Sequence, residues 1–203
     1  MSVHSWAMKE DKRERIRDAA ISVFAEKGFS EARADEIAER AGVAVGTIYN
    51  YFANKEAILI DIFEAEFTRL KEFYQHLRRS GLPVVEQIRQ ILKEHFARLE
   101  ERQELIRVLQ RERFKLLEHP GAEPLELYRE IVAYVEELLR EGIENGLLRE
   151  CNPRIIAHAL FGAVESVTHC SMICSPEESQ QLFREAPEEL AKFIWRGITL
   201  EGG

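Results

Sequence analysis

The sequence has few of the features that mark secreted, membrane or metal-binding proteins. Its three cysteines are an odd number and lack the spacing of a zinc site, which predicts a reducing compartment, no disulfide framework and no metal. No run approaches the about 20 apolar residues that a membrane helix needs. Charged residues follow Met8 at once, so we expect no secretory segment at the start. We therefore expect a cytoplasmic protein that does not enter a membrane.

Signatures of catalysis are also missing. The chain contains no nucleophile elbow, no phosphate-binding glycine loop and no HExxH motif. His169, Cys170 and Cys174 form the one cluster that raises the question of a metal, and they leave a zinc ion short of a fourth ligand. Free cysteines more often act as small apolar residues. The sequence therefore predicts neither an enzyme nor a bound cofactor.

The sequence has no excess of positive charge either, but the distribution of its charged residues along the chain is informative. Residues 1–55 hold nine basic and nine acidic side chains, so the net charge of −8 falls entirely on the rest of the chain. An acidic body is repelled by nucleic acid. Any contact with DNA is then confined to the N-terminal part.

What the sequence does contain is a succession of helical patterns. Apolar residues at helical spacing predict a helix over residues 9–27 after a mobile arm at 1–8, and a long helix after the cap Asn54. Asn152-Pro153 and Pro187 are expected to open the last two helices. No strand pattern occurs. We predict an all-α chain with an N-terminal domain at 1–53 and a larger helical domain at 54–203.

The stretch at residues 37–52 has the pattern of two short helices joined by a tight turn. Ile37 belongs to an apolar face of the first helix, and Gly42 suits the left-handed conformation that ends a helix. Ile48 anchors the second helix, and polar or amphipathic residues such as Tyr49 alternate with the anchors. Hydroxyl, amide and aromatic groups on one outer face suit a DNA major groove. This is the pattern of a helix-turn-helix motif.

The same motif and its flanks resemble the N-terminal DNA-binding domain of TetR-family transcriptional regulators. The resemblance runs over residues 10–60 and is carried by AAISVFAEKGF at 19–29, IA at 37–38, AGV at 41–43, GTIYNYF at 46–52 and NKEAIL at 54–59. It implies a three-helix DNA-binding head and a C-terminal ligand-binding and dimerisation domain. It also implies a homodimeric repressor that reads a near-palindromic double-stranded DNA operator and responds to a small-molecule effector, which either releases the repressor from DNA or, less commonly, promotes binding.

The resemblance and the outer face of the motif select the DNA-binding candidates. They are Arg33, Val45, Gly46, Thr47, Tyr49, Asn50, Tyr51 and Lys55. Val45, Gly46 and Asn50 are expected nearest the bases, and the others to contact mainly phosphates. The family usually has threonines at the positions of Arg33 and Ala34. Without that hydroxyl cap the helix start is weaker by about 1 kcal/mol, unless Ser30 or Asp35 compensates.

The helix that begins at Pro153 carries little charge and many small residues, among them Ala159 and Gly162. Such a helix must be covered all round. It is either the central core helix of one subunit or, as the resemblance implies, part of a four-helix bundle formed with the last helix across a twofold axis.

The C-terminal domain also contains candidates for binding an effector. They are Phe63, Phe67, Tyr74, Phe96, Arg107, Arg111, Phe114, Tyr128, His158, Phe161 and Glu165, and plain core packing or a solvated face is the alternative for each. The segments at 138–146, 152–153 and 160–162 are similar to a subgroup of the family that controls fatty-acid degradation genes by sensing acyl-CoA. An acyl chain needs an apolar tunnel, and its phosphates need arginines.

A different effector class stays open from the residues alone. A flat aromatic or cationic drug suits aromatic walls with a carboxylate such as Glu165. The protein is then a drug-responsive repressor of an efflux-pump gene.

Overall fold

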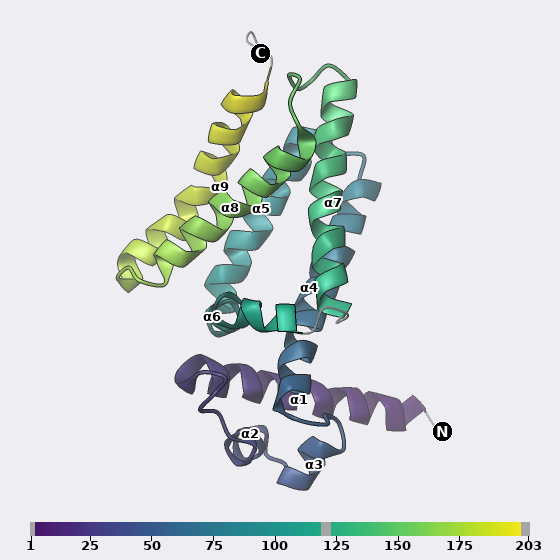
Figure 1. Ribbon diagram of the computed structural model, residues 1–203, viewed down its shortest axis with the longest axis vertical. Coiled ribbons are helices and arrows are strands. Elements are labelled where there is room, and N and C mark those ends of the chain that lie inside the picture. Colours follow the sequence, from purple (N-terminus) through teal and green to yellow (C-terminus); the bar gives the residue numbers. More distant parts are fainter. Residues whose placement is uncertain (1–2, 119–122, 200–203) are drawn as a thin grey trace. The chain divides into compact units, whose positions relative to one another are not determined.

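The computed structural model describes residues 3–118 and 123–199, with side chains from residue 11 onward except that of residue 117. These residues form nine α-helices and one 3-10 helix, joined by short turns (Figure 1). Their β-type pairing is a single isolated bridge between Leu148 and Thr199. The all-α prediction is confirmed.

The chain divides into two compact units. The first comprises residues 1–66 and 104–125, and the second comprises residues 67–103 and 126–203. Helix α4, Lys55–Arg79, therefore contributes to both units. This division differs from the expected boundary between residues 53 and 54, because the start of α4 and a later segment pack with the N-terminal helices. The functional boundary stays a prediction.

The first unit is built on α1, Val3–Lys27. The helix begins six residues before Lys9, so the expectation of a mobile arm at 1–8 is wrong over the described residues. No proline or glycine in residues 3–8 interrupts the helix. Phe24 is fully buried on α1, and it packs edge-on against Phe29 with ring centroids 5.4 Å apart. This pair forms part of a small apolar core beneath the helix-turn-helix.

A buried carboxylate ties α1 to α4 within this unit. Asp61 is 4% exposed and pairs with Arg13 at 2.5 Å and with Arg17 at 2.7 Å. At its N-terminus α4 is capped by Asn54, whose Oδ1 accepts the N–H of Ala57 at 2.8 Å. The capping prediction for Asn54 is confirmed.

The segment that returns to the first unit consists of α6, Gln103–Glu112, and the 3-10 helix η1, Arg113–Glu118. Arg111 donates a hydrogen bond to the carbonyl of Phe24 near the end of α1. Glu112, only 8% exposed, accepts the N–H of Phe29 at 3.3 Å. These contacts join α6 to the turn that leads into the helix-turn-helix.

The second unit is a bundle of α5, Val84–Glu101, α7, Glu123–Glu144, α8, Pro153–Ser171, and α9, Pro176–Ile198. Leu138 and Leu139 of α7 are fully buried in its core. The turn after α7 passes through Gly146, whose φ of +67° favours glycine. Helix α9 packs against both α5 and α8.

The expectation that the last helix opens at Pro187 is wrong. Helix α9 begins at Pro176, where Ser175 accepts the N–H of Glu178 and the Glu178 carboxylate accepts the N–H of Ser175. Pro187 lies buried inside the helix. The capping box starts the helix, and the surrounding packing tolerates the one backbone hydrogen bond that Pro187 cannot donate.

Candidate nucleic-acid interface and effector domain

The turn of the helix-turn-helix has the geometry that its glycine allows. Helix α2, Ala34–Ala41, ends at Gly42 with φ of +65° and ψ of +41°. The N–H of Val43 then bonds to the carbonyl of Ala38 at 3.0 Å. Such left-handed closure satisfies the free carbonyls at the end of α2. It turns the chain sharply into α3, Val45–Tyr49.

Helix α3 has a buried side and an open side. Ile48 is 1% exposed and Phe52 just beyond the helix is 3% exposed, whereas Val45 is 39% and Tyr49 is 55% exposed. A Cβ added at Gly46 would meet no atom within 4 Å, so the backbone there faces open space. The outer face therefore offers one ring, one hydroxyl and approachable backbone. None of its side chains is charged.

The remaining DNA-binding candidates are also at least partly accessible. Asn50 and Arg33 are exposed, and Thr47, Tyr51 and Lys55 are half-buried. The arrangement suits neutral hydrogen bonds and van der Waals contact with bases and sugar-phosphate. The roles of these eight residues in DNA binding stay predictions.

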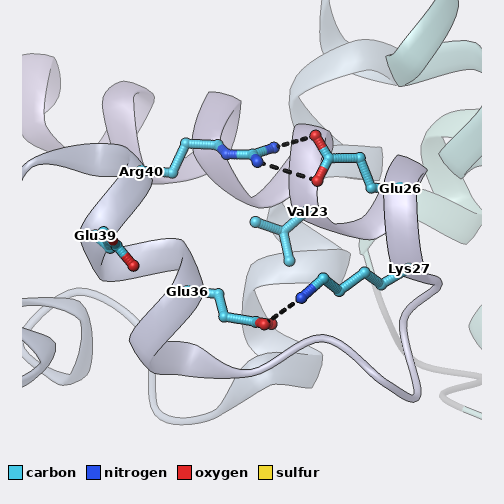
Figure 2. Close-up of a pocket in the computed structure, with 6 residues that line it drawn as sticks. All are labelled: Val23, Glu26, Lys27, Glu36, Glu39 and Arg40. Atoms are coloured by element: carbon cyan, nitrogen blue, oxygen red, sulfur yellow. Dashed lines mark hydrogen bonds and ion pairs between the residues drawn. The ribbon is translucent and has the colours of Figure 1, made fainter.

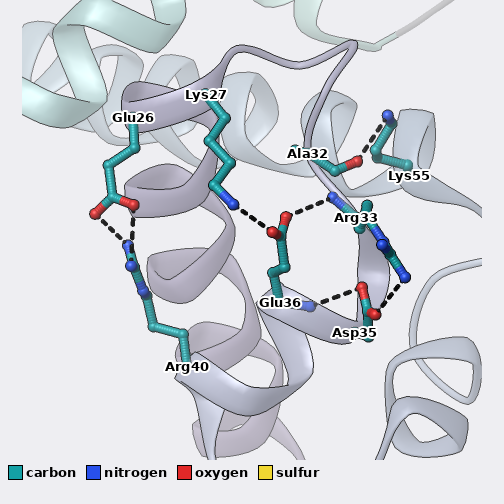
Figure 3. Close-up of polar contacts among 8 residues, drawn as sticks. All are labelled: Glu26, Lys27, Ala32, Arg33, Asp35, Glu36, Arg40 and Lys55. Atoms are coloured by element: carbon teal, nitrogen blue, oxygen red, sulfur yellow. Dashed lines mark hydrogen bonds and ion pairs between the residues drawn. The ribbon is translucent and has the colours of Figure 1, made fainter.

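The start of α2 replaces the missing hydroxyl cap with two carboxylates. Asp35 Oδ1 accepts the N–H of Glu36 at 3.1 Å, and Glu36 Oε2 accepts the N–H of Arg33 at 3.1 Å (Figure 3). Asp35 thus takes the place of the absent threonine in capping α2, which is one of the two compensations that the sequence suggested. The Arg33 guanidinium lies 2.7 Å from Asp35 Oδ2, with both side chains mostly exposed.

Lys55 is bonded to the protein itself. Its Nζ donates to the carbonyl of Ala32 at 3.0 Å (Figure 3). It also donates to the carbonyl of Ser30 at 3.1 Å and lies 4.7 Å from the centroid of the Phe29 ring. The ammonium therefore holds the loop between α1 and α2 to the start of α4. Any phosphate contact by this group has to compete with these two bonds.

Two ion pairs connect α1 and α2 across a hollow of about 340 Å³ that is lined by Val23, Glu26, Lys27, Glu36, Glu39 and Arg40 (Figure 2). Arg40 binds Glu26 in bidentate fashion at 2.7 and 3.0 Å, and Lys27 pairs with Glu36. The hydrogen bond from Arg40 lowers the pKa of Glu26 below its ordinary value of 4.5, and the one from Lys27 lowers the pKa of Glu36. The charged lining makes this hollow unsuitable for an apolar effector.

Comparison with known proteins identifies the family. Residues 16–62 match the model of bacterial regulatory proteins of the tetR family, and residues 81–169 match the model of the tetracyclin repressor-like C-terminal domain. The fatty acid metabolism regulator protein of Bacillus subtilis is 32% identical over 79% of this chain and 84% of its own length. The chain belongs to the TetR family. It is a DNA-binding transcriptional repressor.

Solved structures share the fold of this TetR-family chain across both units. The fatty acid degradation regulator FadR from Bacillus halodurans is 29% identical, with a TM-score of 0.79 over 91% of this chain and 94% of its own. FadR from Bacillus subtilis in complex with stearoyl-CoA is 27% identical, with a TM-score of 0.76 over 91% of this chain and 98% of its own. Among the described residues no helix is long and apolar enough to cross a membrane.

The structure divides the effector candidates of this TetR-family protein between the two units. Phe63, Arg107, Arg111 and Phe114 lie in the first unit, and the other candidates lie in the second. Arg111 is tied to α1, Phe114 is 65% exposed, and Phe63 is 1% exposed.

In the second unit one aromatic cluster joins three helices. Tyr128 of α7 lies 5.9 Å from Phe67 of α4 and 6.2 Å from Phe161 of α8, measured between ring centroids. All three side chains are half-buried. Half-buried rings that converge from separate helices can line the path of an apolar ligand.

The other candidates in this unit have different surroundings. Tyr74 is 6% exposed and lies 5.0 Å from Tyr134, whose hydroxyl donates to Gln87 at 2.7 Å. Burial raises the pKa of Tyr134 to about 12. Phe96 is fully buried, whereas His158 is exposed and so does not face the core. Glu165 already has an interaction partner.

Helix α8 leaves much of its apolar surface uncovered. Its buried residues are Ala157, Thr168 and Ser171. Ile155 is 64% exposed, Gly162 faces open space, and Phe193 on the neighbouring α9 is 72% exposed. The interpretation of α8 as the central core helix of one subunit therefore does not fit. An uncovered stripe of this kind is typical of a protein interface.

Sequence reasoning missed the residues that hold the first unit together. Asp61 and Glu112 are buried acids that each have a partner far away in sequence, 44 residues for Asp61 with Arg17 and 83 for Glu112 with Phe29. A carboxylate on an otherwise apolar helical face is the one local sign of such a contact. That sign does not name the partner.

Proposed function

We propose that this TetR-family repressor controls genes of fatty-acid metabolism and that a long-chain acyl-CoA is its effector. The proposal rests on one observation, the similarity that extends through both units to a regulator solved with stearoyl-CoA. The protein acts in the cytoplasm, and binding of the effector favours a conformation with low affinity for the operator.

The second unit supplies chemistry that suits an acyl chain. Phe67, Tyr128 and Phe161 present apolar rings from α4, α7 and α8. Burying each CH₂ group of a ligand contributes about 0.8 kcal/mol. An affinity that rises with chain length is therefore the expected signature.

The drug-responsive alternative has less support. It depends on a carboxylate such as Glu165 beside aromatic rings, and Glu165 already has an interaction partner. A cationic ligand would have to displace that partner before it gained an ion pair.

A thermal-shift series tests the effector. The chain is melted with acyl-CoAs of increasing length, with CoA alone, with free fatty acids and with cationic dyes. At a ligand concentration 100 times Kd, binding adds about 2.7 kcal/mol of stability, which corresponds to a rise in Tm of about 5–10 °C for a chain of this size. Stabilisation by dyes alone would overturn the proposal.

Two alanine variants locate the site. Tyr128→Ala should remove most of the shift given by long acyl-CoA, and Phe114→Ala, an exposed aromatic in the other unit, should retain it. Equal shifts in both variants would show that the aromatic cluster takes no part. The melting temperature of each unliganded variant serves as its own baseline.

DNA binding is proposed to use the outer face of α3, with Tyr49 at its centre. Tyr49→Phe removes only the hydroxyl and Tyr49→Ala removes the whole ring. If the hydroxyl bonds a phosphate, Tyr49→Phe weakens operator binding by about 1 kcal/mol, roughly fivefold. If the ring supplies the contact, only Tyr49→Ala weakens it. Wild-type affinity in both variants would exclude Tyr49 from the interface.

The repressor is also proposed to be a homodimer that pairs through α8 and α9. Ile155, Gly162 and Phe193 give an apolar surface with room for close approach. Phe193→Glu should yield a monomer in size-exclusion chromatography with light scattering. Phe114→Glu, which changes a similarly exposed ring in the other unit, should stay dimeric. A dimeric Phe193→Glu variant would place the interface on another surface.

A further inference from the structure

Two thiols meet where α8 ends and the chain turns into α9. The Sγ atoms of Cys170 and Cys174 are 3.5 Å apart. Cys170 is exposed and Cys174 is half-buried. Cys170 lies in the last turn of α8, and Cys174 follows the final helical residue by three positions. Nothing in the repressor function described above uses this pair.

The local backbone fixes the two thiols in this arrangement. The N–H of Cys174 bonds to the carbonyl of Cys170 at 3.2 Å, which keeps the two residues one turn apart. Ser179 Oγ donates to the carbonyl of Ser171 at 2.6 Å, and Ser175 caps α9 directly after Cys174. The end of α8 and the start of α9 therefore hold the segment between the two cysteines in place. Such preorganisation favours reactions in which both sulfurs take part.

We propose that Cys170 and Cys174 form a redox-reactive dithiol site that closes to an internal disulfide by exchange with small-molecule disulfides. In the first step the Cys170 thiolate attacks one sulfur of the small disulfide, and one small thiolate leaves. In the second step the Cys174 thiolate attacks Cys170 Sγ and expels the other small thiolate. The pair loses two protons and two electrons, and one disulfide becomes two thiols.

The geometry assigns the order of attack. Cys170 is the more exposed of the two cysteines and is therefore the one that a dissolved disulfide reaches more readily. The hydrogen bond with Cys170 raises the pKa of the Cys174 thiol, so Cys174 stays protonated longer and serves as the resolving group. The two sulfurs need to approach by about 1.5 Å to reach bonding distance. Because Cys174 lies beyond the end of α8, the turn can supply that movement without unwinding the helix.

Cys151 provides an internal comparison. It is half-buried and precedes the N-cap of α8, at the opposite end of that helix from the pair. Without a neighbouring thiol it can form only a mixed disulfide. Trypsin would separate the sites, because residues 150–154 form one peptide and residues 155–184 form another that contains both Cys170 and Cys174.

The experiment uses the full-length protein in its native assembly, treated with oxidised glutathione and then alkylated under acid quench. Mass spectrometry of peptide 155–184 should show a loss of two hydrogen atoms, no alkyl groups and no retained glutathione. Reduction with dithiothreitol should restore two alkylatable thiols. Cys151→Ser should behave identically, whereas Cys174→Ser should accumulate the mixed disulfide at Cys170.

Three results would overturn the proposal. Glutathione retained on peptide 155–184 of the wild type would show that Cys174 does not resolve the mixed disulfide. An unmodified pair under conditions that modify Cys151 would show that the pair is covered in the native assembly. A disulfide-linked dimer on a non-reducing gel, absent in Cys170→Ser, would show that the bond forms between chains instead.

Discussion

Lys55 offers the sharpest test of what stabilises the first unit. The sequence predicts that it contacts DNA, whereas the structure shows it bonded to carbonyls of the protein itself. Lys55→Met keeps the apolar stem and removes the ammonium. Hydrogen bonds from a charged donor contribute about 1.5–3 kcal/mol each when well buried, and contact of a cation with a ring adds about 0.5–1 kcal/mol. Since Lys55 is half-buried, we expect a total loss of about 2–3 kcal/mol.

The matched control is Lys27→Met. Lys27 is a lysine of the same unit whose ion pair with Glu36 is largely exposed. Exposed pairs contribute about 0.2–1 kcal/mol. At about 2–4 °C for each kcal/mol in a chain of this size, Lys55→Met should lower Tm by about 5–10 °C and Lys27→Met by less than about 4 °C.

The assay is thermal unfolding followed by circular dichroism, with hydrogen exchange at residues 29–32 as a local probe. Exchange there should accelerate in Lys55→Met only. Operator binding is then measured against salt concentration. If Tm and exchange in Lys55→Met match those of Lys27→Met, the bonds to Ser30 and Ala32 do not stabilise the loop and the reasoning fails. A salt slope reduced by about one unit would assign a phosphate contact as well.

Three further predictions concern the same unit. Gly46→Ala, on helical backbone in open space, should stabilise the fold by about 0.5–1 kcal/mol yet weaken operator binding, whereas Gly42→Ala should lose about 1–2 kcal/mol in thermal unfolding because its φ is positive. The lowered pKa of Glu26 means that its pairing with Arg40 stabilises the fold above pH 4.5 and that this stabilisation is lost as pH falls below that value. The protection factors of the α2 amides, which are corrected for the slower intrinsic exchange in acid, should therefore fall, and less steeply in Glu26→Gln. Arg33→Gln should reduce the salt slope of operator binding by about one unit if Arg33 contacts a phosphate, while Arg40→Gln, measured alongside, should leave it unchanged.

Local signals in the sequence predicted some of the helix boundaries and missed others. Asn152-Pro153 opens α8 as expected, and Asn152 Oδ1 accepts the N–H groups of Arg154 and Ile155. The information for a cap lies within four residues, so sequence alone suffices. The prediction for Pro187 was wrong because a proline in the sequence does not show whether it lies in the first turn of a helix or inside it. The capping box at Ser175 was the stronger signal.

The sites were predicted less completely, for a physical reason. The outer face of α3 follows from helical periodicity and was predictable. The partners of Lys55 are loop carbonyls 23 and 25 residues away, and backbone carbonyls carry no signature in the sequence. His158 on α8 is a second example. It is exposed, because neighbouring helices decide which face of an apolar helix is covered. Long-range pairing thus decides which charged side chains are available to a ligand.

The pairing of charged side chains within the protein also affects how this repressor can bind DNA. Arg40 is held in a bidentate pair by Glu26, and Lys55 is bonded to two carbonyls, so a phosphate that recruits either one must replace existing bonds. Arg33 is different, because its partner Asp35 is 52% exposed and the guanidinium itself is 72% exposed. An exposed pair costs at most about 1 kcal/mol to separate. Of these three cations, Arg33 is therefore the one that a phosphate can recruit with the smallest loss of existing bonds, and α3 itself carries no charge. Phosphate attraction through Arg33 would bring the neutral face of α3 to the bases, where discrimination depends on contact geometry more than on salt concentration.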